Sequence, residues 1–255
     1  MASIDLLLEG VPGRTDQGYL GQSSVTLIDG STVVDTGGLA RRPMLRDALE
    51  ATGTDPREID DVLLSHVHFD HVQNVDLFEN ATVHVPADEI ERVETGGHDW
   101  ATPPFADRML DALDVAQMTG GEVLPGVEAV HSPGHVEHHY SFVLERDSLT
   151  IGITGDAIKN VREFVTGDPF TLWDDAVAAE TQRRLAERLD FVVPGHDAPF
   201  YVEEDGSVTP CDDVALTVRL QMSGESETRV TTESSREEVA PYPESVAPVA
   251  VHQSF

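Results

Sequence analysis

The feature that most constrains this chain is a cluster of polar side chains directly after a short apolar run. Residues 61–65 (DVLLS) lead into HVHFDH (66–71), which places three histidines and one aspartate within six positions. Burying imidazole and carboxylate groups without partners costs several kcal/mol, so core packing explains them poorly. The same groups are good ligands for zinc, iron or manganese. A turn at the end of a buried strand can direct all four inward, which predicts a metal site.

Three shorter motifs follow, each after a strand candidate: PGH (133–135), TGD (154–156) and PGH (194–196). Each ends in a ligand-type side chain, and its glycine permits a tight turn directly after the strand. One such motif alone would be weak evidence. In this order behind HVHFDH they indicate a single constellation with seven candidate metal ligands: His66, His68, Asp70, His71, His135, Asp156 and His196.

Together these motifs resemble the metallo-β-lactamase superfamily over roughly residues 20–200. The resemblance implies a four-layered αββα sandwich, in which two β-sheets lie face to face and helices cover the outside. It also implies two metal sites. One metal would be held by His66, His68 and His135, the other by Asp70, His71 and His196, and Asp156 would bridge the two.

The segment VVDTGG (33–38) matches another motif of that family, in which the aspartate lies beside the metal ligands. Asp35 is therefore interpreted as a hydrogen-bond acceptor that orients a ligand. The alternative is an ordinary turn aspartate.

The mechanism that the resemblance implies uses two divalent cations, zinc first, with iron or manganese as alternatives. A hydroxide that bridges the metals would attack a carbonyl or phosphorus centre. Asp70 could position the proton of this nucleophile, and Asp156 and Asp35 would complete the catalytic set. The nearest candidates for a leaving-group acid are His138 and His139; for His139, which falls on the family's usual histidine, a structural role is equally open.

Two details indicate which branch of the superfamily this chain resembles. His68 stands where the oxygen- and nitric-oxide-reducing members have glutamate, and no cysteine falls in the ligand pattern of the common zinc β-lactamases. The stretch SHVHFDH (65–71) is similar to that of the N-acyl homoserine lactonases, and HVHFDHVQNVDLF (66–78) resembles metallo-β-lactamase domain-containing protein 1. We therefore expect hydrolysis of a small ester, thioester or lactone.

Two other activities stay open. A persulfide-dioxygenase-like enzyme shares the fold but holds a single iron with two histidines and an aspartate. A phosphodiester hydrolase is the second alternative, because one member of the resembled branch is associated with RNA cleavage. Metal content discriminates the first alternative from a two-metal hydrolase.

The charge of the chain is unusual: 47 acidic residues against 16 basic ones give a formal net charge of −31. Lys159 is the only lysine, a composition similar to that of proteins from salt-loving archaea. At 1 M salt the Debye length of about 3 Å would screen the self-repulsion of such a chain. The charge makes nucleic acid an unlikely partner, because phosphate binding relies on basic surface. A small-molecule substrate is expected instead.

Alternating strands and helices place the fold in the α/β (α+β) class. Strands are predicted at 25–28, 32–34, 61–65, 81–85, 127–131, 139–145, 148–154, 191–193 and 213–222, with helices at 44–52 and 175–189. Residues 1–221 are interpreted as one domain and 222–255 as a flexible acidic tail rich in Ser, Thr and Glu. The loop 95–108 carries Trp100 and Phe105, either over the substrate or as packing groups.

No apolar run approaches the roughly 20 residues of a membrane span. The first residues have no basic start before a long apolar stretch, so we expect no secretory signal. The single cysteine, Cys211, excludes an internal disulfide. These features predict a cytoplasmic protein without a membrane partner. Its oligomeric state is left open, a homodimer being one option.

Overall fold

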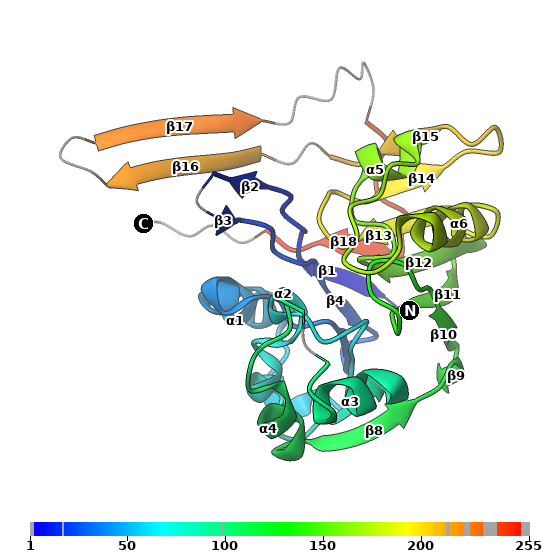
Figure 1. Cartoon of the computed structure of the whole chain (residues 1–255). Coiled ribbons are helices and arrows are strands. Elements are labelled where there is room, and N and C mark those ends of the chain that lie inside the picture. Colours follow the sequence, from blue (N-terminus) through cyan, green and yellow to red (C-terminus); the bar gives the residue numbers. More distant parts are fainter. Residues whose placement is uncertain are drawn as a thin grey trace.

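Two seven-stranded β-sheets lie face to face, and helices cover the outer side of each sheet (Figure 1). The computed structural model describes residues 3–16, 18–97, 99–212, 215–221, 225–231 and 239–250. The order of layers is helix, sheet, sheet, helix. The predicted αββα architecture is therefore confirmed.

The first sheet mixes parallel and antiparallel neighbours. In spatial order its strands are β18 (Val246–Pro248), β1 (Ile4–Leu8), β4 (Val25–Ile28), β5 (Thr32–Val34), β6 (Asp61–Leu63), β7 (Thr82–Pro86) and β8 (Asp114–Met118). The strands β5 to β8 run parallel, so their carboxyl ends meet at one edge of the sheet. This edge carries the segment that follows β6.

The second sheet is antiparallel except for one parallel pair, β12 with β13. In spatial order it contains β15 (Val208–Pro210), β14 (Phe200–Val202), β13 (Phe191–Pro194), β12 (Leu149–Gly155), β11 (Tyr140–Arg146), β10 (Val127–His131) and β9 (Gly121–Leu124). Two separate hairpins, β2–β3 (Arg14–Thr15, Gly18–Tyr19) and β16–β17 (Ala215–Gln221, Glu225–Thr231), complete the strands of the described chain.

The helices are short and lie outside the sheets (Figure 1). They are α1 (Arg42–Thr52), α2 (Phe69–Val72), α3 (Ala87–Glu94), α4 (Ala106–Asp111), α5 (Val161–Thr166) and α6 (Asp175–Ala186), with 3-10 turns at Leu39–Arg41, Pro56–Glu58 and Val75–Leu77. None of the helices in the described ranges combines the length and apolar character that crossing a bilayer requires.

Three apolar clusters separate the four layers. Neighbouring residues on one strand face different clusters: Val62 packs toward the outer helices, whereas Leu63 lies between the sheets. Likewise Val192 packs under the outer helices of the second sheet, and Val193 lies between the sheets. Because both faces of these strands are covered, their sequences are continuously apolar rather than alternating.

Local sequence signals set several element ends. Three residues, Asp29 to Ser31, join β4 to β5, and Asp29 (φ 52°) and Gly30 (φ 74°) both adopt the left-handed conformation that a type I′ turn requires. Helix α1 ends at Gly53, which has a left-handed φ of 77°. The side chain of Asp174 caps α6 by accepting hydrogen bonds from the backbone N–H groups of Ala176 and Val177.

Part of the segment that we predicted as a tail lies against the sandwich instead. Strand β18 pairs in parallel with β1, and the Val246 side chain is buried between the sheets. The backbone N–H of Ser245 donates to Asp147 Oδ2 at 2.6 Å. A three-residue strand within a polar, acidic stretch has no periodicity that sequence reading can detect. The structure also describes β17 (225–231) and residues 239–250 of this segment, whereas 222–224, 232–238 and 251–255 fall outside the described residues.

Candidate metal centre

The four sequence motifs meet at one end of the sandwich, where strands of both sheets finish. HVHFDH follows β6, the first PGH follows β10, and TGD and the second PGH lie at the ends of β12 and β13. All seven predicted ligands are buried, none with more than 6% of its surface exposed. The structure therefore brings the seven side chains together in three overlapping groups: His66, His68 and His135; Asp70, His71 and His196; and His66, His71 and Asp156.

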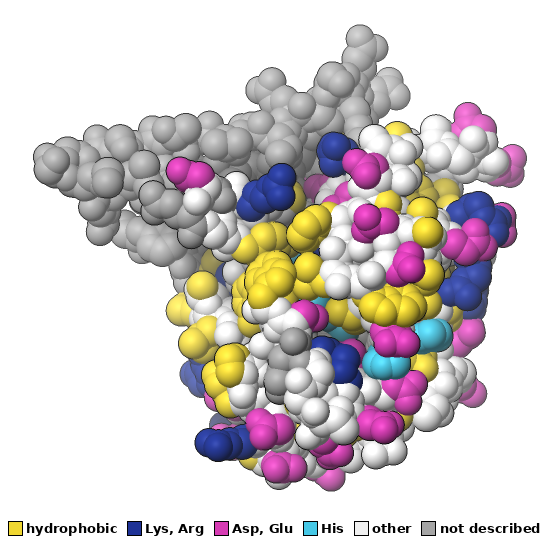
Figure 2. Space-filling view, in the orientation of Figure 1, with side chains coloured by type: hydrophobic (Ala, Val, Ile, Leu, Met, Phe, Trp, Pro, Cys, Tyr) yellow, Lys and Arg dark blue, Asp and Glu magenta, His cyan; other side chains and the backbone are white. Residues whose placement is uncertain are grey.

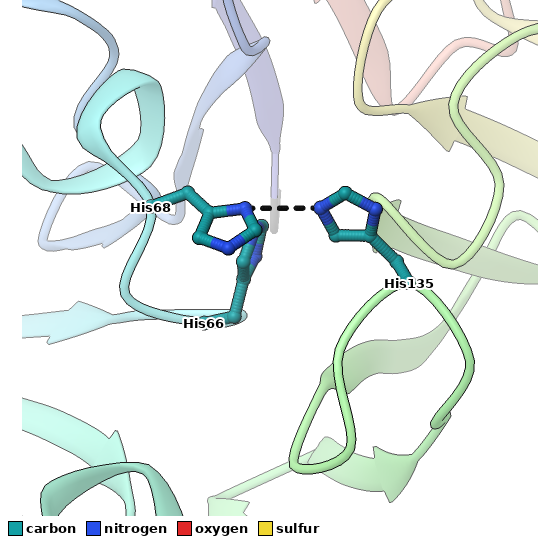
Figure 3. A group of neighbouring side chains, drawn as sticks. All are labelled: His66, His68 and His135. Atoms are coloured by element: carbon teal, nitrogen blue, oxygen red, sulfur yellow. Dashed lines mark hydrogen bonds between the residues drawn. The ribbon is translucent and has the colours of Figure 1, made fainter. Parts of the chain in front are cut away.

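The first trio consists of His66, His68 and His135, drawn in Figure 3. Its three potential ligand nitrogens lie within 4.8 Å of one another. His135 Nε2 is 3.0 Å from His68 Nδ1, the contact dashed in Figure 3. Two nitrogens bound to one tetrahedral zinc ion at about 2.0–2.1 Å would lie roughly 3.3 Å apart. The trio is thus already at the spacing of a shared cation.

The second trio consists of Asp70, His71 and His196. His196 Nε2 is 3.5 Å from Asp70 Oδ2, and His71 Nε2 is 4.0 Å from Asp70 Oδ1. Asp70 and His71 belong to the short helix α2, which brings both side chains to the centre from one turn. A mixed carboxylate and imidazole set suits zinc, iron or manganese.

Asp156 lies between the trios, and each of its carboxylate oxygens faces one of them. Oδ1 is 3.2 Å from His71 Nε2 and 3.0 Å from His196 Nε2. Oδ2 is 3.1 Å from His135 Nε2. The space around this carboxylate also explains a glycine, because a Cβ on Gly195 would stand 2.6 Å from Asp156 Oδ1. The family resemblance predicted that Asp156 bridges two metals, and in the structure this carboxylate faces both trios.

Several ligand-type atoms at the centre have no hydrogen-bond partner within the described chain. They are His135 Nδ1 and five further atoms of the trios and Asp156: His66 Nε2, Asp70 Oδ2, His71 Nε2, Asp156 Oδ1 and His196 Nε2. Native proteins seldom leave buried polar atoms unsatisfied, because each one costs about 1–3 kcal/mol. Divalent cations bound by the trios and Asp156 would satisfy these five atoms at once. The residues present therefore fit a metal centre.

The pKa shifts of the histidines also favour a metal centre. Burial lowers the pKa of His66 and of His135 well below the usual value, which keeps both imidazoles neutral and able to bind metal. Burial also disfavours protonation of His71, but the carboxylates of Asp35 and Asp156 outweigh it and raise the pKa of His71. The carboxylates thus attract positive charge to the centre, and bound cations would supply that charge without protonating the ligands.

Asp35 lies where an orienting acceptor should be. Its Oδ2 accepts hydrogen bonds from His71 Nδ1 at 2.7 Å and from Ser65 Oγ at 2.8 Å. Ser65 Oγ is in turn 3.0 Å from His66 Nδ1. His66 and His71 consequently carry their proton on Nδ1 and direct a free Nε2 to the centre. The contacts favour the orienting role of Asp35 over that of a simple turn residue.

His139 is buried beneath the centre, with both ring nitrogens in hydrogen bonds. Nε2 accepts from the backbone N–H of Asp156 at 3.0 Å, and Nδ1 lies 3.1 Å from Ser132 Oγ. Burial lowers the pKa of His139 to about 3. A neutral imidazole with both nitrogens occupied cannot deliver a proton to a leaving group. Of its two predicted roles, the structure supports positioning of Asp156. His138 is partly exposed and lies 3.8 Å from Asp88.

Two residues at the centre were missed by the sequence analysis. Asp99 Oδ2 is 3.0 Å from His68 Nε2, and Lys159 Nζ is 3.9 Å from Asp156 Oδ2. Asp99 sits in a Gly- and Pro-rich loop without any motif, so no sequence signal identified it. Lys159 did carry a signal: it is the only lysine and follows Asp156 by three positions.

The mouth of the centre is apolar on one side and polar on the other. The rings of Tyr19, Phe69 and Trp100 are 6.1–6.5 Å apart, and Trp100 is 61% exposed. Figure 2 shows hydrophobic side chains gathered near the middle of one face of the molecule, with acidic ones around them. A hollow of about 640 Å³ adjoins His196 and is lined by residues that include Lys159. The space directly over the centre, lined by Tyr19, Trp100 and Asp156 among others, is only about 10 Å³.

Comparisons with known proteins agree with this geometry. A model of the metallo-beta-lactamase superfamily matches residues 18–196. Metallo-beta-lactamase domain-containing protein 1 from Xenopus laevis is 30% identical over 214 residues, which cover 81% of this chain and 84% of that protein. An N-acyl homoserine lactonase from a Bacillus species is 29% identical over 155 residues, which cover 58% of this chain and 60% of that protein.

Solved structures share the fold. A protein from Thermotoga maritima named as a metallo-beta-lactamase has a TM-score of 0.64 and 26% identity, covering 78% of this chain and 99% of that one. An N-acyl homoserine lactone hydrolase, solved with N-hexanoyl-L-homoserine at its catalytic metal centre, has a TM-score of 0.60 and 20% identity. That alignment covers 76% of this chain and 92% of the hydrolase.

Proposed function

Because this chain belongs to the metallo-β-lactamase superfamily and its relatives include hydrolases, we propose that it hydrolyses a small ester, thioester or lactone with two divalent metal ions. The observation that carries the proposal is the position of Asp156. Its two oxygens face the two trios separately, at 3.0–3.2 Å from the nearest imidazole nitrogens. A single-metal site would need only one of these trios.

The first trio would hold one ion, the second trio the other, and Asp156 would contact both. Zinc is the metal that we propose, with iron or manganese as alternatives, because the donor set is imidazole and carboxylate. Bound there, the two cations would generate a nucleophile from water near neutral pH and polarise the oxygen of the electrophile. The chain's own residues would orient the ligands and the substrate.

Four side chains would act directly. Asp70 would accept a hydrogen bond from the attacking water and so align its oxygen. Lys159, with 3% of its surface exposed, has its ammonium beside Asp156 and hydrogen-bonded to the carbonyl oxygen of Phe170. An ammonium has three N–H donors, so Lys159 can also donate to the acyl oxygen as negative charge develops on it. Tyr19 and Trp100 would contact the apolar part of the substrate.

The two rival activities fit less well. A mononuclear iron enzyme leaves one complete trio without a purpose, together with its unsatisfied buried atoms. A nucleic-acid phosphodiester would approach a chain with 47 acidic residues and 16 basic ones, which repels phosphate. A small uncharged or singly charged carboxylic ester suits both the aromatic rim and the lone ammonium.

The proposal is tested by metal analysis combined with a substrate panel in molar salt. The panel contains esters, thioesters, lactones and phosphodiesters. We expect two metal ions per chain and hydrolysis of a carboxylic ester class. The variants Asp156→Ala and His135→Ala should each lose metal and at least about 100-fold in kcat/KM, because each removes a ligand.

His131→Ala is the matched control, because His131 is an exposed histidine at the end of β10. It should retain both metals and full activity. Unchanged hydrolysis by Asp156→Ala would exclude the two-metal mechanism. One iron per chain with oxygen consumption on a persulfide would show the rival activity instead.

A further inference from the structure

Asp99 connects the loop that follows α3 to the first trio. Its Oδ2 lies 3.0 Å from His68 Nε2, between side chains that are 24% and 2% exposed. We propose that Asp99 is a positioning residue, which holds His68 in the tautomer and orientation for metal binding and fixes the adjacent loop over the centre. The inference rests on the metal centre of the proposed function.

The tautomer follows from the two contacts of His68. A neutral imidazole has one N–H donor and one free lone pair. The carboxylate of Asp99 can only accept, so the proton of His68 belongs on Nε2. Nδ1 then keeps its lone pair, and this is the atom that lies 3.0 Å from His135 Nε2 in the first trio. His66 and His71 use the opposite arrangement, with Nδ1 hydrogen-bonded and Nε2 free.

Asp99 itself has little freedom to move. Its Oδ1 accepts from the backbone N–H groups of Ala101 and Thr102, both at 2.9 Å. Arg92 Nη1 lies 3.9 Å from Asp99 Oδ2. Arg92 is held in turn by two 2.8 Å hydrogen bonds to Glu89, a fully buried carboxylate of α3. Contacts from Glu89 through Arg92 and Asp99 therefore connect helix α3 to His68.

The same segment forms part of the mouth. The backbone N–H of Phe69 donates to the carbonyl oxygen of Ala101 at 2.9 Å. Residues 99 and 101 are thus both attached to the HVHFDH segment, and Trp100 lies between these two attachments. The Trp100 ring is 6.1 Å from Tyr19 and 6.5 Å from Phe69. Loss of Asp99 should therefore loosen both a metal ligand and the aromatic rim.

The test compares Asp99→Asn and Asp99→Ala with Asp107→Asn, an exposed carboxylate change on α4. The full chain is freed of metal and titrated with Zn²⁺ against a fluorescent chelator in molar KCl. We expect one of the two equivalents to bind about 10–100-fold more weakly in Asp99→Ala, with the other unchanged. Asp99→Asn should lose less, because its amide oxygen still accepts from His68. The control should match the native chain.

A second measurement is independent of metal binding and of activity. Long-range ¹H–¹⁵N NMR of the metal-free protein reports which nitrogen of His68 carries the proton. We expect the Nε2–H form in the native chain and a mixture of tautomers in Asp99→Ala. If that variant does not fold, the zinc titration of Asp99→Asn decides, and one equivalent should still bind more weakly than in the native chain. Equal weakening of both equivalents, or no weakening of either, would overturn the inference. An unchanged His68 tautomer in Asp99→Ala would overturn it as well. A native chain that binds fewer than two ions would overturn the proposed function instead.

Discussion

Contacts on several sides fix both the carboxylate and the backbone of Asp156. Its oxygens contact imidazoles of both trios, and His139 holds its backbone N–H from below. Gly195 leaves the space that its carboxylate occupies. The sequence motif TGD indicated the ligand, but only the fold shows that a histidine seventeen positions earlier sets its orientation.

Lys159 gives a prediction at the residue scale. Lys159→Met keeps the apolar stem and removes the ammonium beside Asp156. If the ammonium stabilises charge on the acyl oxygen, kcat for the best ester of the panel should fall about 100-fold with little change in KM. Metal content should stay at the native value, because Lys159 is not a ligand. Steady-state kinetics and metal analysis of the same sample check both expectations.

Arg183→Met is the control for Lys159→Met, since the Arg183 side chain is 58% exposed on α6 and lies outside the hollow. It should leave kcat unchanged. Loss of metal with unchanged kcat per bound metal in Lys159→Met would assign the lysine a purely structural role and refute its contact with substrate.

Ligand residues were more predictable than the residues that orient them. The seven ligands and Asp35 lie in short motifs next to apolar strands, so a pattern of residue type and position indicates them. Ser65, Ser132 and Asp99 act through contacts with partners that only the folded chain brings near. Serine and aspartate in a loop are common, and nothing in their spacing distinguishes these three. For His139 the spacing left two roles open, and the buried hydrogen bonds select one.

Among the elements, the strands that position ligands were the most predictable. The hairpin β4–β5, the helices α1 and α6, and the strands β6, β7, β10, β11, β12 and β13 all lie where apolar runs and turn residues placed them. These runs are continuous because helices cover the outer face of each sheet. A long apolar run ending in Gly-His or Gly-Asp is thus informative about both fold and site.

The strands at and next to the sheet edges were not predicted: β1, β8, β9, β14, β15 and β18. The last three have three residues each and, unlike β5 and β6, no turn or ligand motif beside them marks their position. Strand β18 belongs to a stretch whose average composition is polar, although Val246 is buried against the core. The helix α4 begins at Ala106, inside the segment that we expected to be a loop. Average composition over a window therefore conceals short elements that tertiary contacts stabilise.

For the molecule as a whole, charge gives the next prediction. A net charge of −31 destabilises the compact state by self-repulsion, and molar salt screens that repulsion. The melting temperature should therefore rise steeply between 0.1 M and about 3 M KCl. Circular dichroism during heating measures the shift. Sucrose is the control, because it favours burial without screening charge.

A melting temperature that is indifferent to KCl, or that rises equally in sucrose, would contradict the inference of a salt-adapted chain. The same experiment sets the conditions for the others, since the metal and activity assays require a folded protein. It does not depend on the identity of the substrate.

We have proposed that the ends of both sheets form a two-metal centre in which Asp156 contacts both ions. Anomalous X-ray diffraction at the zinc absorption edge, from crystals of the chain grown with Zn²⁺, would locate these ions. We expect two anomalous peaks, one among His66, His68 and His135 and one among Asp70, His71 and His196, with Asp156 next to both. A single peak in one trio, or peaks only at surface carboxylates, would contradict it.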